Sequence, residues 1–143
     1  MFDNAHPTSI LLVEDDQVDV MNVKRAFKKN NIKTPLYVAW DGIEALELLR
    51  GARRDELEIF PKIILLDINM PRMNGIELLR EIRGDDKLSK LLVFVLTTSS
   101  NDEDIINAYS LNVAGYILKP VTFDKFVEAV STLRSFWELN ELP

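Results

Sequence analysis

Five short apolar runs recur along the chain, each followed by a segment with the period of an amphipathic helix. Most runs are nearly continuous in apolar residues rather than alternating, which predicts strands buried on both faces of a parallel sheet. Helical segments between successive strands predict right-handed βα units with helices on both faces of the sheet. The pattern therefore predicts a doubly wound α/β domain with five strands in the order 2-1-3-4-5 and five helices. The expected strands are Ile10–Glu14, Leu36–Trp40, Ile63–Leu66, Leu92–Leu96 and Tyr116–Leu118.

The segments between and after these strands carry local signals for helix starts and turns. Asp16, with Asp19 three residues later, is a good N-cap for the first helix. Asn74-Gly75 predicts a tight turn with positive φ at Gly75, and Gly42 is expected to open the second helix in the same way. The charged segment Gly51 to Pro61 is expected to be a longer loop. The expected helices are Val18–Asn30, Ile43–Arg53, Gly75–Arg83, Asp102–Asn112 and Thr122–Trp137.

Composition excludes several functional classes. A chain of 143 residues with 47% apolar residues fits one domain with a single core. The net charge of −6 disfavours a nucleic-acid-binding surface. The absence of Cys excludes disulfides and thiolate metal sites. Because there is no signal-peptide pattern and no apolar run long enough to span a bilayer, we expect a cytoplasmic protein without membrane contact.

Side chains that can bind a metal ion or a phosphoryl group lie where the apolar runs end. Glu14 and Asp15 end the first run, Asp67 the third, Thr97 the fourth and Lys119 the fifth. Open α/β sheets bind ligands at the carboxyl ends of their strands, and the order 2-1-3-4-5 places strands one and three side by side. The set of three acids, a hydroxyl and an amine suits binding a divalent metal and moving a phosphoryl group onto Asp67.

Each of these residues taken alone has a plainer structural explanation. A strand-end Asp such as Asp67 commonly caps the next turn, and an acidic pair before a helix is commonly an N-cap. A Thr that ends a strand, such as Thr97, is usually a turn former, and a lone Lys is usually solvated. The functional interpretation depends on all of them occurring together at strand ends.

Four motifs resemble those of the response-regulator receiver domains of bacterial two-component signalling. The resemblance covers about Ser9 to Trp137 and implies a flavodoxin-like fold. The expected organisation is a flexible tail over 1–8, a receiver domain over 9–137 and a C-terminal tail over 138–143. The motifs are Val13-Glu14-Asp15-Asp16, Leu66-Asp67-Ile68-Asn69-Met70-Pro71 with Met73-Asn74-Gly75, Leu96-Thr97-Thr98, and Gly115-Tyr116-Ile117-Leu118-Lys119-Pro120.

The resemblance implies a phosphoacceptor and a metal site. Asp67 would be the phosphoacceptor, since a carboxylate needs no deprotonation at neutral pH to act as a nucleophile. Asp15 and Asp67 would bind Mg²⁺ (or Mn²⁺) directly, with the main-chain carbonyl of Asn69 as a further ligand. Glu14 would act through water, although receivers often have Asp at this position.

The resemblance also implies roles for residues on the later strands. Thr97 and Lys119 would bind the phosphoryl oxygens by a hydrogen bond and by charge. Lys119 precedes Pro120, and a cis peptide bond there would aim the amine inward. Tyr116 would be the aromatic residue that turns inward when the Thr97 hydroxyl moves toward phosphate; the alternative is a half-buried Tyr that never switches. Two further residues, Asn69 and Ser99, occupy positions that tune self-dephosphorylation.

The sequence predicts that another protein supplies the phosphoryl group. The only histidine, His6, lies in the expected tail, and no Gly-rich nucleotide loop of the P-loop or kinase type is present. By resemblance the donor is a sensor histidine kinase or a phosphotransfer protein, and the chain is a signalling protein rather than an enzyme. A haloacid-dehalogenase-type phosphatase is the enzymatic alternative. Such enzymes place a second Asp two residues after the first, where this chain has Asn69.

Output is expected through protein contacts with a downstream target that the sequence does not name. The chain ends soon after the fifth helix, so we expect no output domain; a relay intermediate that passes the group to another histidine is the alternative.

The last helix is apolar over about half its circumference, and its extra edge suggests a partner or dimer surface, or one covered by the tail Glu138–Pro143. The ending resembles regulators partnered with bacterial phytochromes, which implies a homodimer through the fourth helix, fifth strand and fifth helix. The edge comprises Phe126, Ala129, Leu133 and Phe136.

Overall fold

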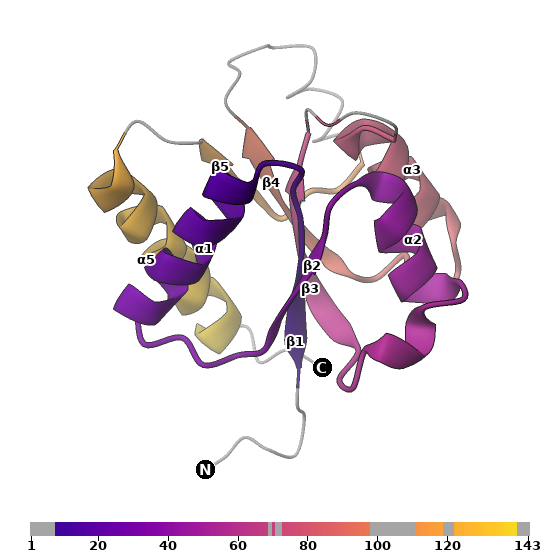
Figure 1. The fold of residues 1–143 in the computed structure, drawn as a ribbon, viewed down its shortest axis with the longest axis horizontal. Helices are drawn as coiled ribbons and strands as arrows, with labels where there is room; N and C mark the ends of the chain where they lie inside the picture. The colour runs from indigo at the N-terminus through magenta and orange to yellow at the C-terminus, as the bar shows by residue number, and fades with distance from the viewer. Residues whose placement is uncertain (1–7, 69, 71–72, 98–110, 119–121, 140–143) are drawn as a thin grey trace.

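A parallel five-stranded sheet forms the centre of the molecule, with helices on both faces (Figure 1). The computed structural model describes residues 8–68, 70, 73–97, 111–118 and 122–139. The strand order β2-β1-β3-β4-β5 confirms the predicted topology. Helices α1 and α5 cover one face of the sheet, and α2 and α3 cover the other. The strands are β1 (Ser9–Val13), β2 (Leu36–Ala39), β3 (Pro61–Asp67), β4 (Leu92–Thr97) and β5 (Gly115–Leu118). The helices are α1 (Gln17–Lys29), α2 (Gly42–Arg50), the 3-10 turn η1 (Arg54–Glu56), α3 (Gly75–Gly84) and α5 (Phe123–Leu139).

Alternate side chains of the strands feed two apolar cores. Leu11 and Ile64 point toward α2 and α3, whereas Leu12 and Leu65 point toward α1 and α5. All five residues of β1 and six of the seven residues of β3 are buried. This two-sided burial explains why these strands appear in the sequence as continuous apolar runs. Burial on both faces also holds β1 and β3 in fixed positions, and it thereby fixes the positions of their carboxyl ends.

Side-chain caps define where the helices begin. The Asp16 carboxylate accepts hydrogen bonds from the amides of Val18 (2.8 Å) and Asp19 (3.1 Å), which confirms its prediction as the α1 N-cap. Before α3, Asn74 and Glu77 form a reciprocal capping box.

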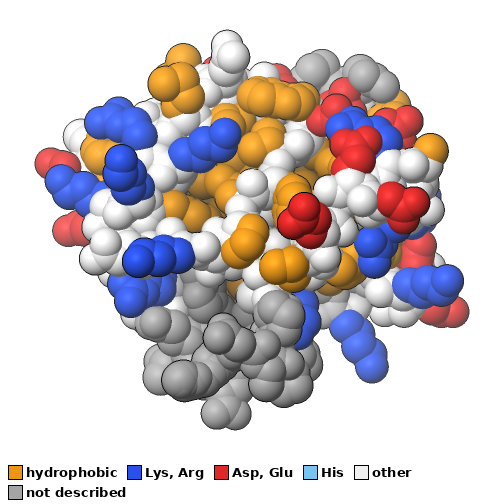
Figure 2. Space-filling view, turned by 60° about the horizontal axis from the view of Figure 1, so that its bottom comes forward, with side chains coloured by type: hydrophobic (Ala, Val, Ile, Leu, Met, Phe, Trp, Pro, Cys, Tyr) orange, Lys and Arg blue, Asp and Glu red, His pale blue; other side chains and the backbone are white. Residues whose placement is uncertain are grey.

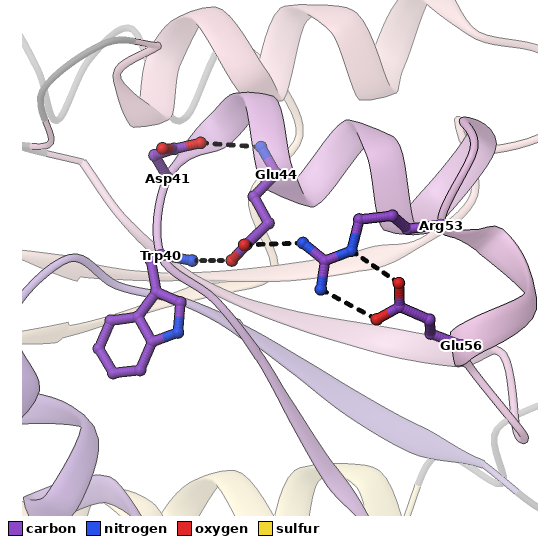
Figure 3. A network of polar contacts seen from close by, with 5 residues as sticks. All are labelled: Trp40, Asp41, Glu44, Arg53 and Glu56. Carbon is purple, nitrogen blue, oxygen red and sulfur yellow. Dashed lines mark hydrogen bonds and ion pairs between the residues drawn. The ribbon is translucent and has the colours of Figure 1, made fainter.

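The start of α2 combines a cap with an ion-pair network (Figure 3). Asp41 accepts from the Glu44 amide at 2.8 Å, and the Glu44 side chain reaches back to the Trp40 amide at 2.7 Å. Arg53 bridges Glu44 (2.7 Å) and Glu56 (2.8 and 2.9 Å), and it holds the pKa of the Glu56 carboxyl below its usual value. The network thereby ties the end of β2 to η1.

Two glycines occupy their positions for a different reason from the one predicted. Neither Gly42 nor Gly75 has a positive φ, so the expected left-handed turn at Gly75 is wrong. Both are the first residues of their helices, and both lack the room for a Cβ atom. A Cβ on Gly42 would lie 2.8 Å from the Met73 carbonyl oxygen, and one on Gly75 would lie 2.6 Å from the Ile68 Cα. Close backbone approach, rather than turn conformation, is what requires glycine here.

Two helix ends in the described part of the chain differ from prediction by more than one residue. Helix α2 ends at Arg50, three residues early, because its C-cap Gly51 is extended, with φ −103° and ψ −153°. The loop that follows contains η1, which the sequence pattern did not predict. Helix α5 runs two residues beyond the predicted end, to Leu139. The predicted helix Asp102–Asn112 falls outside the described residues, apart from Leu111 and Asn112, which form a turn.

Arg83, near the end of α3, holds three segments together through main-chain carbonyl groups. Its guanidinium donates to the carbonyls of Leu111 (2.7 Å), Asn112 (2.8 Å), Ser89 (3.0 Å) and Leu91 (2.8 Å). Burial lowers the pKa of the Arg83 guanidinium from its usual value. The four acceptors join α3 to the approaches of β4 and β5.

Replacing Arg83 by Met is expected to destabilise the fold by about 3 kcal/mol, because four main-chain carbonyls, three of them in part-buried hydrogen bonds, lose their donor. Arg83→Lys should recover only part of this loss, since an ammonium cannot reproduce the planar fork. Urea unfolding measures both. The control is Arg80→Met, three residues earlier on the same helix at an exposed position. Equal urea midpoints for the Arg80 and Arg83 variants would show that Arg83 does not hold these three segments together.

None of the helices in the described part of the chain is long and apolar enough to cross a membrane.

Candidate functional site

The carboxyl ends of β1 and β3 bring three acidic side chains together. The two strands are neighbours in the sheet, and Val13 pairs with Leu66 in register. Glu14 and Asp15 directly follow β1, and Asp67 is the last residue of β3. Each of these residues therefore leaves the same edge of the sheet at the switch point, as the strand order predicts.

The cluster fits a divalent cation. One carboxylate oxygen from each of Glu14, Asp15 and Asp67 can be chosen so that all three lie within 4.8 Å of one another. Glu14 is 0% and Asp67 4% exposed, whereas Asp15 faces solvent. Two ionised carboxylates at such a separation repel by roughly 3–4 kcal/mol at an effective dielectric constant of about 20. A hard cation with oxygen ligands would remove this repulsion, so the donor set suits Mg²⁺ or Mn²⁺.

Local hydrogen bonds position Glu14 and separate it from Asp16. The Glu14 amide donates to the Ala39 carbonyl at 3.0 Å, which extends the β1–β2 pairing by one residue. The Glu14 carboxylate accepts from the Asp16 amide at 3.1 Å. The Asp16 carboxylate is occupied in capping α1. Of the run Glu14-Asp15-Asp16, the first two thus belong to the cluster and the third to the helix.

Gly75 helps to fix the Asp67 backbone, although its sequence context indicates only a turn. The Ile68 amide donates to the Leu96 carbonyl at 3.2 Å, and the Gly75 amide donates to the Ile68 carbonyl at 2.9 Å. The first residue of α3 is therefore hydrogen-bonded back to the residue after Asp67. A Cβ on Gly75 would collide with the Asp67 carbonyl oxygen. The Asn-Gly pair marks this position in the sequence, but only the packing shows its function.

Thr97 and Tyr116 lie on the two strands beyond Asp67. Asp67 pairs with Leu96 on β4, so Thr97 ends its strand one position further along the same edge. Thr97 is buried, at 2% exposure. Tyr116 pairs with Val95 and is half-buried against the core beneath α2 and α3. Its expected switching stays a prediction.

Several predicted site residues lie outside the described residues. They are Asn69, Ser99, Lys119 and the expected cis bond at Pro120.

The structure describes only two of the four side chains in the predicted apolar edge of the last helix. Phe126 is buried in the core shared by α1 and α5, and Ala129 packs against that core. Phe126 therefore serves the single chain, which corrects its assignment to an exposed edge. The side chains of Leu133 and Phe136 lie outside the part that the structure describes. The dimer surface and the alternative of a covering tail stay predictions.

A family model, described as the response regulator receiver domain, matches residues 10–131. The chain belongs to the response-regulator receiver family. This receiver is 36% identical to the response regulator Rcp1 of Synechocystis over 138 residues, which are 96% of this chain and 94% of Rcp1. The flavodoxin-like fold predicted for it is confirmed by solved structures.

Two solved structures are similar to this receiver over most of its length. The phosphorylated cyanobacterial phytochrome response regulator RcpA has a TM-score of 0.83 and 34% identity, covering 92% of this chain and 94% of RcpA. The Mn²⁺-bound form of Rcp1 has a TM-score of 0.82 and 37% identity, with coverage of 92% and 94%. One relative is thus known in a phosphorylated state and another with a divalent metal.

Proposed function

We propose that this receiver accepts a phosphoryl group on Asp67 from a histidine-kinase partner. The observation that carries the proposal is the convergence of Glu14, Asp15 and Asp67 within 4.8 Å of one another. They meet at the carboxyl ends of two strands in a sheet that is covered by helices on both faces. Phosphorylated RcpA and Mn²⁺-bound Rcp1 support it by similarity. The resemblance to phytochrome response regulators supports a phytochrome as the kinase.

In the proposed reaction an Asp67 carboxylate oxygen attacks the phosphorus of a phosphohistidine. A P–O bond forms as the P–N bond breaks, and the imidazole nitrogen leaves with the electron pair and takes up a proton. The product is an acyl phosphate on Asp67. Asp67 is buried and Asp15 beside it is exposed, so we expect the donor to approach Asp67 from the side of Asp15.

The metal proposed for this site is Mg²⁺ or Mn²⁺, held by Asp15 and Asp67, with Glu14 acting through water and the Asn69 carbonyl as a further ligand. When bound, it supplies positive charge that lets an anionic phosphoryl group approach three carboxylates. Thr97 would donate its hydroxyl to a phosphoryl oxygen, and Lys119 would add a positive charge. Asn69 and Ser99 would tune the lifetime of the phosphorylated state.

Two other functions are separable from this one by experiment. A relay intermediate would pass its phosphoryl group from Asp67 to a phosphotransfer histidine, which a transfer assay with purified partners detects. A haloacid-dehalogenase-type phosphatase would release inorganic phosphate from a substrate with many turnovers. Membership of the receiver family favours signalling over the phosphatase.

Phosphorylation is tested by incubating the protein with Mg²⁺ and acetyl phosphate and mapping the product by mass spectrometry. We expect one hydroxylamine-sensitive phosphoryl group on Asp67. It should be absent from Asp67→Asn and present in Asp55→Asn, a matched change at an exposed acid on η1. An unlabelled Asp67, under conditions that label another receiver, would falsify the proposal.

A further inference from the structure

Positive charge is concentrated in one stretch of this acidic protein. Five of its 17 basic residues, and none of its 23 acidic residues, lie between Val20 and Trp40. This stretch covers most of α1, the connection to β2 and β2 itself. The remainder of the chain therefore carries a large excess of acid. The five basic residues are Lys24, Arg25, Lys28, Lys29 and Lys33.

Three of the lysines surround a hollow between the end of α1 and the start of β2. Its volume is about 290 Å³, and Lys24, Lys28 and Lys33 stand around it at exposed positions. Figure 2, which looks toward the amino end of the strands, shows mainly basic side chains beside hydrophobic ones on the α1 side, with acidic ones only at its outer edge. On the α2–α3 side both signs of charge are mixed.

The apolar lining of the hollow has a local structural cause. Helix α1 ends in a Schellman motif, in which the Ile32 amide donates to the Phe27 carbonyl at 2.9 Å and Asn31 has φ 56°. This motif commonly brings the side chains at these two positions into contact. Both side chains, together with Leu36, line the hollow. The apolar surface is therefore explained by the helix end, but the lysines around it are not.

Within the described part of the chain, these lysines are not neutralised by ion pairs. No acidic side chain among the described residues forms an ion pair with Lys24, Lys28 or Lys33. Lys28 lies in the last turn of α1, where the helix dipole favours a cation. Lys24 and Lys28, four residues apart on one helix face, instead repel each other. Arg25 is turned away, over the ring of Phe123 at 4.3 Å.

The rim of the hollow is also held in place. The Asn30 side chain donates to the carbonyls of Ala26 (2.9 Å) and Val127 (3.1 Å), and Arg134 donates to the Asn30 carbonyl at 2.6 Å. These bonds join the end of α1 to α5. A ligand would therefore meet a preformed surface and would order few groups on binding.

We propose that this hollow, at the opposite end of the sheet from Asp67, binds an acidic segment of a partner protein. An apolar side chain of that segment would cover Phe27 and Ile32, and its carboxylates would face Lys24, Lys28 and Lys33. Charge complementarity identifies the partner as acidic, and the small apolar lining calls for a single anchoring side chain.

The other polyanions fit this surface less well. A nucleic acid would be repelled by the net charge of −6. An anionic bilayer would meet the mixed charges of the α2–α3 side on the same face. It would also find no large exposed apolar anchor at the hollow, because the exposed large apolar side chains of the described chain lie elsewhere, at Val18, Met21, Trp40 and Ile43.

Binding is tested on the full ¹⁵N-labelled chain with a synthetic peptide that alternates Glu and Leu. We expect saturable amide shifts at Asn31, Ile32 and Thr34 that weaken as salt rises. Lys24→Glu/Lys28→Glu should raise the dissociation constant about tenfold or more. The matched control is Lys87→Glu/Lys90→Glu, which changes net charge equally at exposed positions on the loop before β4. Labelling of Asp67 by acetyl phosphate, unchanged in both variants, confirms that they are folded.

Three outcomes would overturn the proposal. Shifts spread over all lysines, or equal weakening by both double variants, would indicate nonspecific charge attraction. Equal binding of a peptide with Asn in place of Leu would remove the role of Phe27 and Ile32. Cosedimentation with phosphatidylserine vesicles that Lys24→Glu/Lys28→Glu abolishes, without specific peptide binding, would assign the hollow to a membrane.

Discussion

Asp15→Asn is expected to abolish metal-dependent stabilisation while leaving the metal-free protein as stable as the wild type, or more so. The substitution removes one of three carboxylates that lie within 4.8 Å of one another, and Asp15 is the exposed member of the three. Without metal the change relieves repulsion and costs no buried contact. With metal it removes a ligand, so affinity for Mg²⁺ or Mn²⁺ should fall about tenfold or more.

Thermal unfolding over a series of MgCl₂ or MnCl₂ concentrations measures this effect. A ligand at 100 times its dissociation constant stabilises a protein by about 2.7 kcal/mol, so the wild-type Tm should rise with metal concentration. The Tm of Asp15→Asn should stay nearly constant over the same range, and labelling of Asp67 should be lost. Asp86→Asn, an exposed acid on the loop after α3, should behave as the wild type. An Asp15 variant that gains as much Tm from metal as the wild type would contradict the proposed site.

Among the glycines beside the site, Gly75 is the one whose replacement by Ala is expected to lower the stability most. The new Cβ would lie 2.6 Å from the Ile68 Cα and would collide with the Asp67 carbonyl oxygen. Both obstacles are backbone atoms at the end of a strand buried on both faces, so they cannot rotate away. Overpacking of this kind costs about 3 kcal/mol. At roughly 3 °C per kcal/mol, the Tm should fall by about 10 °C.

The same helix offers a matched control in Gly84→Ala. Gly84 is the last residue of α3, and a Cβ added there would have no neighbouring atom within 4 Å. Its φ is not positive, so Ala should be neutral or stabilise by about 0.4–1 kcal/mol through the unfolded chain. Labelling of Asp67 at low temperature, where both variants are folded, adds a second measurement. Only the Gly75 variant should be slow, because the displaced backbone is that of Asp67. A Tm for Gly75→Ala equal to that for Gly84→Ala would show that the strand end yields easily.

Much of the site could be predicted from sequence because its residues follow directly after apolar strands. Glu14, Asp15 and Asp67 are each adjacent in sequence to a run whose burial is evident from composition, and parallel strands end at one edge. Asp16 is separable from them because N-caps have a local signature that the structure confirms. The right-handed crossover rule and the βα alternation restrict the possible strand orders, and the structure confirms the predicted order 2-1-3-4-5.

Sequence-based predictions are wrong where a residue's position depends on contacts with a segment that is distant in sequence. Phe126 lies on an apolar stripe that is wider than packing on one sheet face requires, yet it packs into the core between α1 and α5. The end of α2 depends on the extended backbone of Gly51. Periodicity places Arg53 in that helix, although it serves an ion-pair network with Glu44 and Glu56. Helical periodicity cannot register such contacts, because it reports only which residues share a face.

The sequence by itself determined the α/β class and the identity of the acidic cluster, because both depend on local periodicity and on which residue follows a strand. The tertiary structure alone decided the strand order, the convergence of three carboxylates within 4.8 Å of one another, and the need for Gly75 in the close approach to Asp67. It also decided that Arg83 joins three segments and that Lys24, Lys28 and Lys33 share one hollow. These features depend on distances between segments far apart in the chain, which only packing sets.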